Sequence, residues 1–166
     1  RKSRNTNFSE TKMLSNKLHR RGNGKVRISS FNLHNKEGEK TNIFKNDEKI
    51  IFKFKIKKFE EVKDAFIEFN FRSIHSNETI FSLVKDLNEL PNIKTFEEVD
   101  YEFSFEIENI IPNTFDLYIK VSEKKFKGQM DIIEGMLPPV IIDNKNDEKF
   151  LDKGYFKFKS FIKKIN

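Results

Sequence analysis

The chain has 166 residues, no cysteine, and a formal net charge of +6 with 35% charged residues. A single domain of this length buries roughly 70% of its unfolded surface, so it needs no disulfide or structural metal to fold. No stretch approaches the about 20 apolar residues of a membrane-spanning helix, and no signal peptide is visible. The absence of cysteine excludes thiol catalysis and is typical of a reducing compartment. Because the first residue is Arg1, we expect the chain to be a fragment of a longer protein.

The positive charge is concentrated at the N-terminus. Residues 1–27 hold nine Lys or Arg against one acid, Glu10, so they carry +8 and the other 139 residues sum to −2. Such a run is more typical of a solvated tail or linker than of a nucleic-acid-binding arm, and the rest of the chain has the mixed charges of an ordinary surface. We therefore predict a flexible basic linker over residues 1–24, with Gly22 and Gly24 near its end, and a folded domain over residues 25–166.

From Val26 onward, apolar and polar residues alternate with a period of two, which is typical of half-buried strands. The cleanest run is KIIFKFKIK at 49–57, and others follow at 65–74, 101–107, 114–121 and 155–162. The first run, VRISSFNL at 26–33, has a mixed pattern that predicts a β-bulge or an edge position. The segment SLVKDLNELPNIKTFEEV at 82–99 is expected to form a short helix or a long loop.

Turn-forming residues separate these runs, as at Lys36-Glu37-Gly38 and Pro112-Asn113. Seven or more short strands with half-polar faces predict an all-β fold, an antiparallel β-sandwich, with a jelly roll as the alternative. Most of the 19 phenylalanines fall on the inward side of the alternation, so we assign them to the core.

Sequence signatures of catalysis are missing: there is no Walker A loop, GxSxG, HExxH or GxGxxG motif. The three histidines lie on different segments without metal-ligand spacing. Paired acids such as Glu60-Glu61 and Glu97-Glu98 fall in polar turns, where solvated carboxylates are the ordinary case. We predict a binding domain with no catalytic residues, no metal and no cofactor.

Four stretches, in order along the chain, carry a resemblance to a known family. These are RRGNGKVRISSFNLHNKEGE at 20–39, NIFKNDEKIIFKFKI at 42–56, IENIIPNTFDLYIKV at 107–121 and MDIIEGMLPPVII at 130–142. They resemble the C-terminal domain of the Wzt family, the ATP-binding subunits of O-antigen polysaccharide ABC transporters. In this chain Asn113-Thr114-Phe115 replaces the family's Gly-Thr-Tyr step, and Pro138-Pro139 interrupts the approach to a late strand at Val140.

The resemblance implies an immunoglobulin-like β-sandwich that recognises the exported polysaccharide without catalysis. It implies an ATP-binding domain upstream of Arg1, a membrane-spanning permease as partner, and a location at the cytoplasmic face of the inner membrane. It further implies a homodimer formed through this domain, with the C-terminal strand exchanged between protomers.

Sugar recognition needs flat aromatic rings for C–H faces and planar polar groups for hydroxyls, and a sheet face projects alternate residues side by side. The outward residues of three runs supply such groups and form our candidate set. One run contributes Phe66, Glu68, Asn70 and Arg72, the second Asp116, Tyr118 and Lys120, and the last Tyr155 and Lys157. Each also has a purely structural interpretation; Glu68 and Arg72, for instance, are expected to form a cross-strand ion pair.

Two other functions stay open at this point. A nucleic-acid or other anionic polymer would bind through the basic arm, although the nearly neutral remainder gives little support, so we predict no nucleic-acid partner. A purely structural sandwich would act in dimerisation or adhesion.

Overall fold

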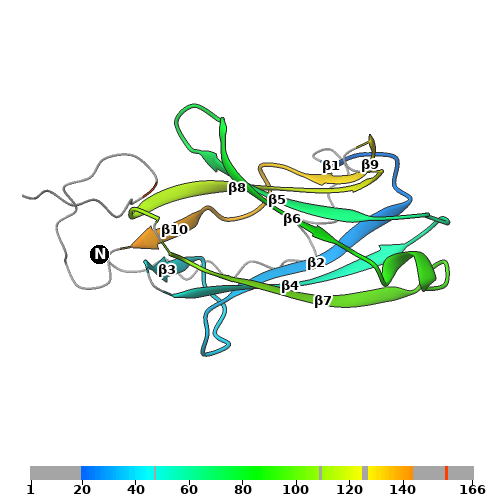
Figure 1. The fold of residues 1–166 in the computed structure, drawn as a ribbon, viewed down its shortest axis with the longest axis horizontal. Coiled ribbons are helices and arrows are strands. Elements are labelled where there is room, and N and C mark those ends of the chain that lie inside the picture. Colours follow the sequence, from blue (N-terminus) through cyan, green and yellow to red (C-terminus); the bar gives the residue numbers. More distant parts are fainter. Residues whose placement is uncertain (1–19, 47, 109, 125–126, 144–155, 157–166) are drawn as a thin grey trace, which may run out of the picture.

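The computed structural model describes residues 20–46, 48–108, 110–124, 127–143 and 156, and these form two packed β-sheets (Figure 1). The strands are β1 (Arg20–Arg21), β2 (Val26–His34), β3 (Ile43–Lys45), β4 (Lys49–Lys58), β5 (Phe66–Ser73), β6 (Thr79–Asp86), β7 (Glu98–Glu106), β8 (Asn113–Glu123), β9 (Lys127–Ile133) and β10 (Val140–Asp143). A short 3-10 helix (Leu90–Asn92) precedes β7. The all-β sandwich predicted from the alternation is therefore confirmed.

The small sheet has three antiparallel strands in the order β2-β4-β7. The large sheet is built around β8, which pairs with β5 along one edge and with β9 and β10 along the other. β6 extends this sheet beyond β5, β1 beyond β9, and β3 beyond β10. The pairing of β10 with β3 is parallel, which differs from the fully antiparallel arrangement expected.

The core lies between the two sheets and is rich in phenylalanine. Phe52 of β4 stacks on Phe69 of β5 with ring centroids 4.6 Å apart, and Phe103 of β7 stacks on the same two rings. These rings come from the inward positions of the predicted alternations, so apolar burial from both sheets holds the sandwich together. Of the 14 phenylalanines that the structure describes, ten lie in this core or pack against it, whereas Phe96 and Phe156 are exposed.

The irregular pattern of the first run corresponds to a bulge in β2. Its register against β4 shifts between Ile28 and Ser30, so Val26 and Ile28 point inward before the shift and Phe31 and Leu33 point inward after it. β2 is also an edge strand of the small sheet, so both expectations for this run are met.

The segment at 82–99 holds the expected short helix within a loop, but it also includes the end of one strand and the start of another. Residues 79–86 form β6, an edge strand whose polar residues face solvent, and only Leu90–Asn92 take a short 3-10 turn. The alternation is weak here because one side of β6 is open to water and needs few apolar residues.

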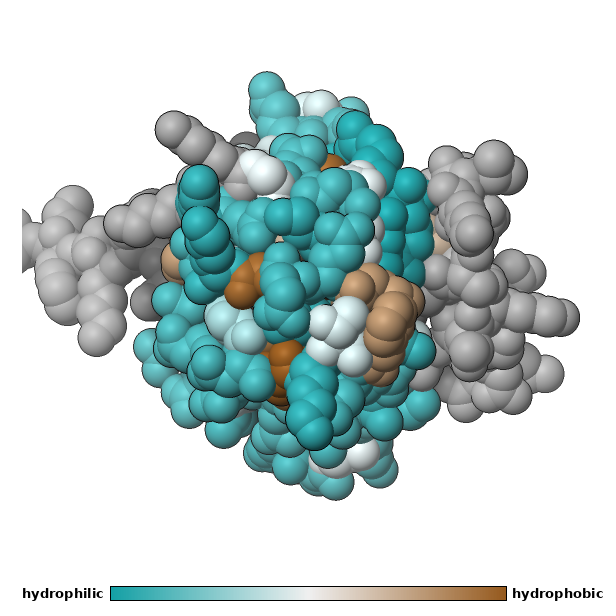
Figure 2. All heavy atoms as spheres, turned by 90° about the vertical axis from the view of Figure 1, so that its right-hand side faces the viewer, coloured by the Kyte–Doolittle hydropathy of each residue, from teal (hydrophilic) through white to brown (hydrophobic). Residues whose placement is uncertain are grey.

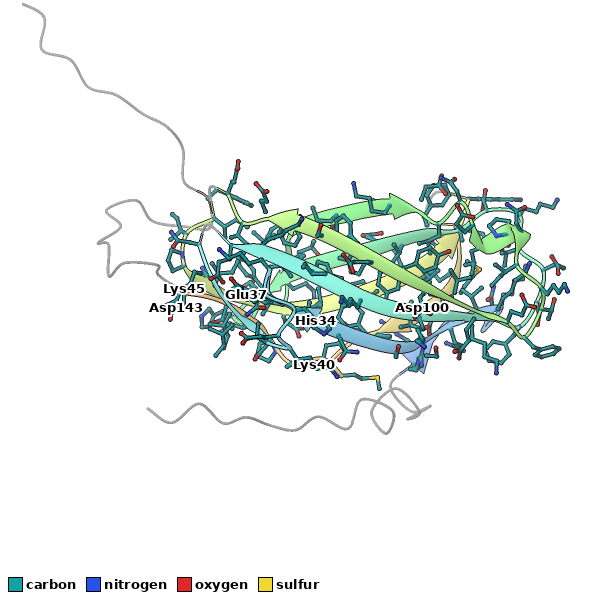
Figure 3. All side chains as sticks on the ribbon, turned by 90° about the horizontal axis from the view of Figure 1, so that it is seen from below. His34, Glu37, Lys40, Lys45, Asp100 and Asp143 are labelled. Carbon is teal, nitrogen blue, oxygen red and sulfur yellow. The ribbon has the colours of Figure 1, made fainter. Side chains whose placement is uncertain are left out.

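The outer face of the small sheet is a solvated ladder of opposite charges. Lys53 lies 3.8 Å from Glu102, and Lys55 lies 3.6 Å from Asp100, which is labelled on this sheet in Figure 3. All four side chains are exposed, so each pair adds little stability. On β4, the residues between Ile51 and Lys57 that point to this outer face include no aromatic side chain.

Candidate functional site

The outer face of the large sheet brings together the candidate residues of two runs that lie far apart in the sequence. In the antiparallel pairing of β5 with β8, Glu68 stands opposite Lys120, Asn70 opposite Tyr118, and Arg72 opposite Asp116. Since directly opposite residues project to the same side of a sheet, these six side chains form one patch. We call this patch the β5–β8 face. Figure 1 shows that β5 and β8 run side by side along the length of the sandwich.

Arg72 is the residue of the β5–β8 face that binds two carboxylates. Its Nη2 donates to Asp116 Oδ2 and its Nη1 to Glu134 Oε1, both at 2.6 Å. The guanidinium is largely buried, which disfavours its charged form, but the two carboxylates outweigh this and the pKa of Arg72 is raised. Arg72 therefore remains a cation that locks β5 to β8 and to the end of β9.

Glu134, directly after β9, bridges two arginines. It accepts from Arg72 and also from Arg21 of β1. The hydrogen bond from Arg72 is the main reason that the pKa of Glu134 lies below its usual value of 4.5; partial burial acts in the opposite direction but is weaker. Glu134 is thus ionised at neutral pH and belongs to the β5–β8 face, although sequence reasoning missed it.

Tyr118 supplies the aromatic ring of this face. The guanidinium carbon of Arg72 lies 5.1 Å from the ring centroid, an arrangement that fixes the ring by a cation–π contact. Opposite it, Asn70 is only 3% exposed and its Oδ1 accepts from Ser82 Oγ at 2.5 Å. Among the described residues, Asn70 Nδ2 and Arg72 Nε have no hydrogen-bond partner. Tyr118 is half-buried and keeps part of its surface accessible.

Glu68 and Lys120 form an ion pair further along the same face, with Lys120 Nζ 3.0 Å from Glu68 Oε2. The expectation of a cross-strand ion pair between Glu68 and Arg72 is wrong. Both residues lie on β5, and the register places Lys120 opposite Glu68 and Asp116 opposite Arg72. Each charged residue of β5 on this face thus stands opposite a charge of the other sign on β8.

The remaining candidates are less central or cannot be placed. Phe66 is half-buried at the start of β5, opposite Ser122 and at the edge of the β5–β8 face. Tyr155 and Lys157 lie outside the described residues. Their described neighbour Phe156 bridges to Ile110 and contacts the ring of Phe81 at 5.9 Å.

Sequence reasoning also missed Ser82, whose hydroxyl donates to Asn70. Ser82 lies on β6, which the weak alternation did not reveal as a strand. Glu134 follows the apolar pair Ile132-Ile133 and precedes Gly135, so the sequence indicates the end of a strand there. It does not indicate that Glu134 pairs with Arg72. In both cases the contact depends on strand neighbours that one sequence does not specify.

The start of the domain differs from the flexible segment expected around Gly22 and Gly24. β1 pairs with β9, and the amides of Asn23 and Gly24 donate to the carbonyls of Gln129 and Met130 at 3.0 and 2.9 Å. Residues 20–24 are therefore fixed to the large sheet by backbone hydrogen bonds.

Two arginines of the basic N-terminal run are paired with one buried carboxylate. Asp131 of β9 is fully buried, and it accepts from Arg20, from Arg27 Nη1 at 2.7 Å and from the amide of Ile28 at 2.8 Å. With Arg21 on Glu134, three of the cations at the start of the described chain are engaged by acids of the fold. This leaves fewer free cations for an anionic polymer than the sequence indicated.

The comparison with protein families decides the identity. The family model of the Wzt C-terminal domain matches residues 17–156. The chain belongs to this family. The resemblance found in the four sequence stretches is therefore confirmed, and it links the chain to O-antigen ABC transporters.

A solved structure supports the fold of this Wzt-family domain. The crystal structure of the C-terminal domain of Wzt is similar with a TM-score of 0.66, over 88% of this chain and 87% of that chain, at 11% identity. At this identity the likeness shows the fold alone. Among curated proteins, no match to this sequence is found.

Two further observations concern the described part of the Wzt-family domain. No helix there has the length and apolar character needed to cross a bilayer. Nor do three or more His, Asp or Glu side chains of the described residues gather in the arrangement of a metal site.

Proposed function

We propose that this domain binds the polysaccharide exported by an O-antigen ABC transporter and that the β5–β8 face is the binding surface. The observation that carries the proposal is the placement of the Tyr118 ring beside the planar groups of Asn70, Arg72 and Asp116 on one sheet face. An aromatic ring offers a flat surface to the C–H face of a sugar, and the carboxylate of Asp116, the most accessible of the planar groups, accepts from its hydroxyls. The buried Asn70 and Arg72 hold these groups in place. Membership of the Wzt C-terminal domain family supports the ligand class.

The paired charges suit binding rather than hydrolysis. A glycosidase needs one carboxyl group whose raised pKa keeps it protonated as a general acid. Here the pKa of Glu134 is lowered by Arg72, and Asp116 and Glu68 each face a cation. An ionised Glu134 accepts hydrogen bonds from hydroxyls and has no proton to donate, which supports binding without catalysis at this face.

In the whole protein, the polysaccharide-binding domain gives substrate recognition to the transporter. We place an ATP-binding domain upstream of it, a membrane-spanning permease beside it, and the assembly at the cytoplasmic face of the inner membrane. The domain pairs as a homodimer with an exchanged C-terminal strand. These parts of the proposal rest on the family.

Titration with the delipidated O-polysaccharide of the source organism tests the binding face. Replacing Tyr118 with Ala removes the stacking ring, and we expect the affinity measured by calorimetry to fall about fivefold to tenfold. Tyr118→Phe keeps the ring and should retain most of the affinity. Both variants keep the Arg72 ion pairs and should fold. Tyr118→Phe also keeps the ring beside Arg72, so its melting temperature should stay close to wild type, whereas Tyr118→Ala should lower it slightly.

A matched control is Lys55→Ala, on the outer face of the opposite sheet, where the side chain is 47% exposed. It should leave the affinity unchanged. Polysaccharide binding that is equally strong in Tyr118→Ala, or that shifts amide resonances of the small sheet and none of β5 or β8, would contradict the proposed face.

A further inference from the structure

Phe96 belongs to the loop just before β7, at the end of the sandwich where β4 ends and β7 begins. This end of the sandwich lies at the right of Figure 1. Its side chain is 68% exposed, the highest value among the large apolar residues that the structure leaves exposed. Its backbone has φ of +72°, in the left-handed region that costs a bulky residue about 1–2 kcal/mol. Because the ring is exposed, burial in the core does not offset this cost, and a contact with a ligand would explain its position.

The loop that carries Phe96 is held rigidly by Lys58. This lysine, the last residue of β4, is fully buried, and its ammonium donates to Pro91 O, Ile93 O and Glu61 Oε2 at 3.0, 2.9 and 2.9 Å. All three of its donors are thus satisfied by the two neighbouring loops. A buried charge fixes the loop in one geometry, because any opening would leave the ammonium without partners.

Backbone and side-chain bonds next to the ring complete the support. The amide of Phe96 donates to Lys58 O at 2.6 Å, and Thr95 Oγ1 donates to Glu61 Oε1 at 3.0 Å. Both bonds of Glu61, to Lys58 and to Thr95, lower its pKa, so the carboxylate is ionised at neutral pH. The exposed ring is therefore presented in a preorganised position, which lowers the entropy cost of binding a ligand.

Phe59 stands beside Phe96 and forms an angled pair with it. The two ring centroids are 6.3 Å apart and the planes meet at 85°, while Lys57 Nζ lies 5.6 Å from the Phe59 ring. Phe59 is half-buried, so it supports the exposed ring from one side. Together the pair forms an apolar corner with polar groups of Lys57, Thr95 and Glu61 around it.

We propose that this corner is a second sugar contact, which stacks one ring of the same polysaccharide chain on Phe96. The inference rests on the proposed function and extends it from one face to two contacts. The ring gives the C–H face of the sugar its apolar surface, and Glu61 and Thr95 lie within the same loop pair to bond hydroxyls.

The small size of the corner favours a sugar over a protein partner. A stable protein interface buries about 800 Å² on each side around an apolar centre. The other large exposed apolar residues of the described chain, Ile43, Ile74, Val84 and Phe156, belong to other segments. Figure 2, which faces this end, shows scattered apolar patches among hydrophilic atoms instead of one continuous apolar area.

The charges near the corner also disfavour an anionic polymer or membrane. Lys57, Lys63 and Lys94 are interspersed with Glu60 and Glu97, and Lys58 is neutralised by Glu61. Anionic partners select clusters of one sign, whereas a neutral sugar ring needs only the aromatic surface and nearby polar groups.

The experiment compares Phe96→Asn with wild type, using the delipidated O-polysaccharide and its isolated single repeat unit as probes. Asn tolerates the left-handed backbone, so the fold should be kept and the melting temperature should stay equal or rise slightly. We expect the affinity for the polysaccharide to fall about threefold to tenfold. Phe96→Trp keeps an aromatic ring and should restore the affinity.

The single repeat unit separates the two contacts. It should shift amide resonances on the β5–β8 face, and the long polymer should additionally shift those of residues 94–97. Normal polymer affinity in Phe96→Asn, with shifts confined to β5 and β8, would overturn the second contact and leave the proposed function intact. If neither the polysaccharide nor the single repeat unit bound to wild type, both the second contact and the proposed function would be overturned.

Discussion

Gly22 lies against the backbone of β9 in a position where a side chain has no room. Its φ is +106°, and a Cβ built on it would approach Met130 O to 2.5 Å and Asp131 N to 2.8 Å. Both atoms belong to backbone and cannot rotate away. We predict that Gly22→Ala lowers the free energy of unfolding by more than about 2 kcal/mol, as measured by urea denaturation.

Gly38 offers a control with the same backbone requirement and no crowding. Its φ is +82°, but no atom lies within 4 Å of a built Cβ. Gly38→Ala should therefore cost only the left-handed penalty of about 1 kcal/mol. Equal losses in the two variants would mean that β9 yields to the methyl group, and that the start of the domain is looser than its hydrogen bonds indicate.

At the scale of elements, Asp131 joins three strands. It is fully buried on β9 and accepts from Arg20 of β1 and from both the side chain of Arg27 and the amide of Ile28 on β2. It therefore ties the large sheet to the small sheet at one end of the sandwich. Arg20 also donates to Ile28 O at 2.9 Å, which closes the cluster.

We predict that Asp131→Asn destabilises the domain by about 3 kcal/mol, because two arginines lose the carboxylate that compensates them in a buried setting. Thermal unfolding followed by circular dichroism measures the loss. Asp100→Asn is the matched control, since Asp100 is 79% exposed on the small sheet and pairs with Lys55 across 3.6 Å. It should change stability by less than about 0.5 kcal/mol. A loss in Asp131→Asn as small as in the control would show that the buried cluster does not join the sheets.

At the scale of the whole molecule, the inward and outward faces of the long strands were predictable from the sequence. The alternation in β4, β5 and β8 assigns Phe52, Phe69 and Leu117 to the core, and the irregular run in β2 shows its bulge. β6 was not predictable, because an edge strand open to water needs little apolar content. β9 was hidden by Gly128 and by the inward Asp131, which break the apolar alternation.

The candidate site was predictable as a set of residues but not as an arrangement. The alternation identifies Asn70 and Tyr118 as outward residues, yet their contact depends on β5 pairing with β8 across almost 50 residues of chain. Nothing local encodes that pairing. Arg72 is buried and bonded to Glu134, which a third segment of the chain brings to the face. The sequence alone therefore predicted a solvated surface where the structure has a network of ion pairs.

This network also predicts how the stability of the molecule depends on pH. The pKa of Glu134 is lowered from 4.5, first by the hydrogen bond from Arg72 of β5 and then by the charges of Arg72 and of Arg21 of β1; Asp116 of β8 faces the same Arg72. A carboxyl group whose folded pKa is depressed adds stability above its unfolded pKa, and this stability is lost as the pH falls through the folded value.

We therefore expect wild type to exceed Glu134→Gln in stability most strongly near neutral pH, and the difference to shrink between about pH 5 and pH 3. Urea midpoints measured across this range test it. Glu102→Gln, at a carboxylate 61% exposed and 3.8 Å from Lys53, should differ little from wild type at any pH. If the gap for Glu134→Gln were the same at every pH, the glutamate would act through packing, because only an ion pair that the proton can break makes the gap depend on acidity.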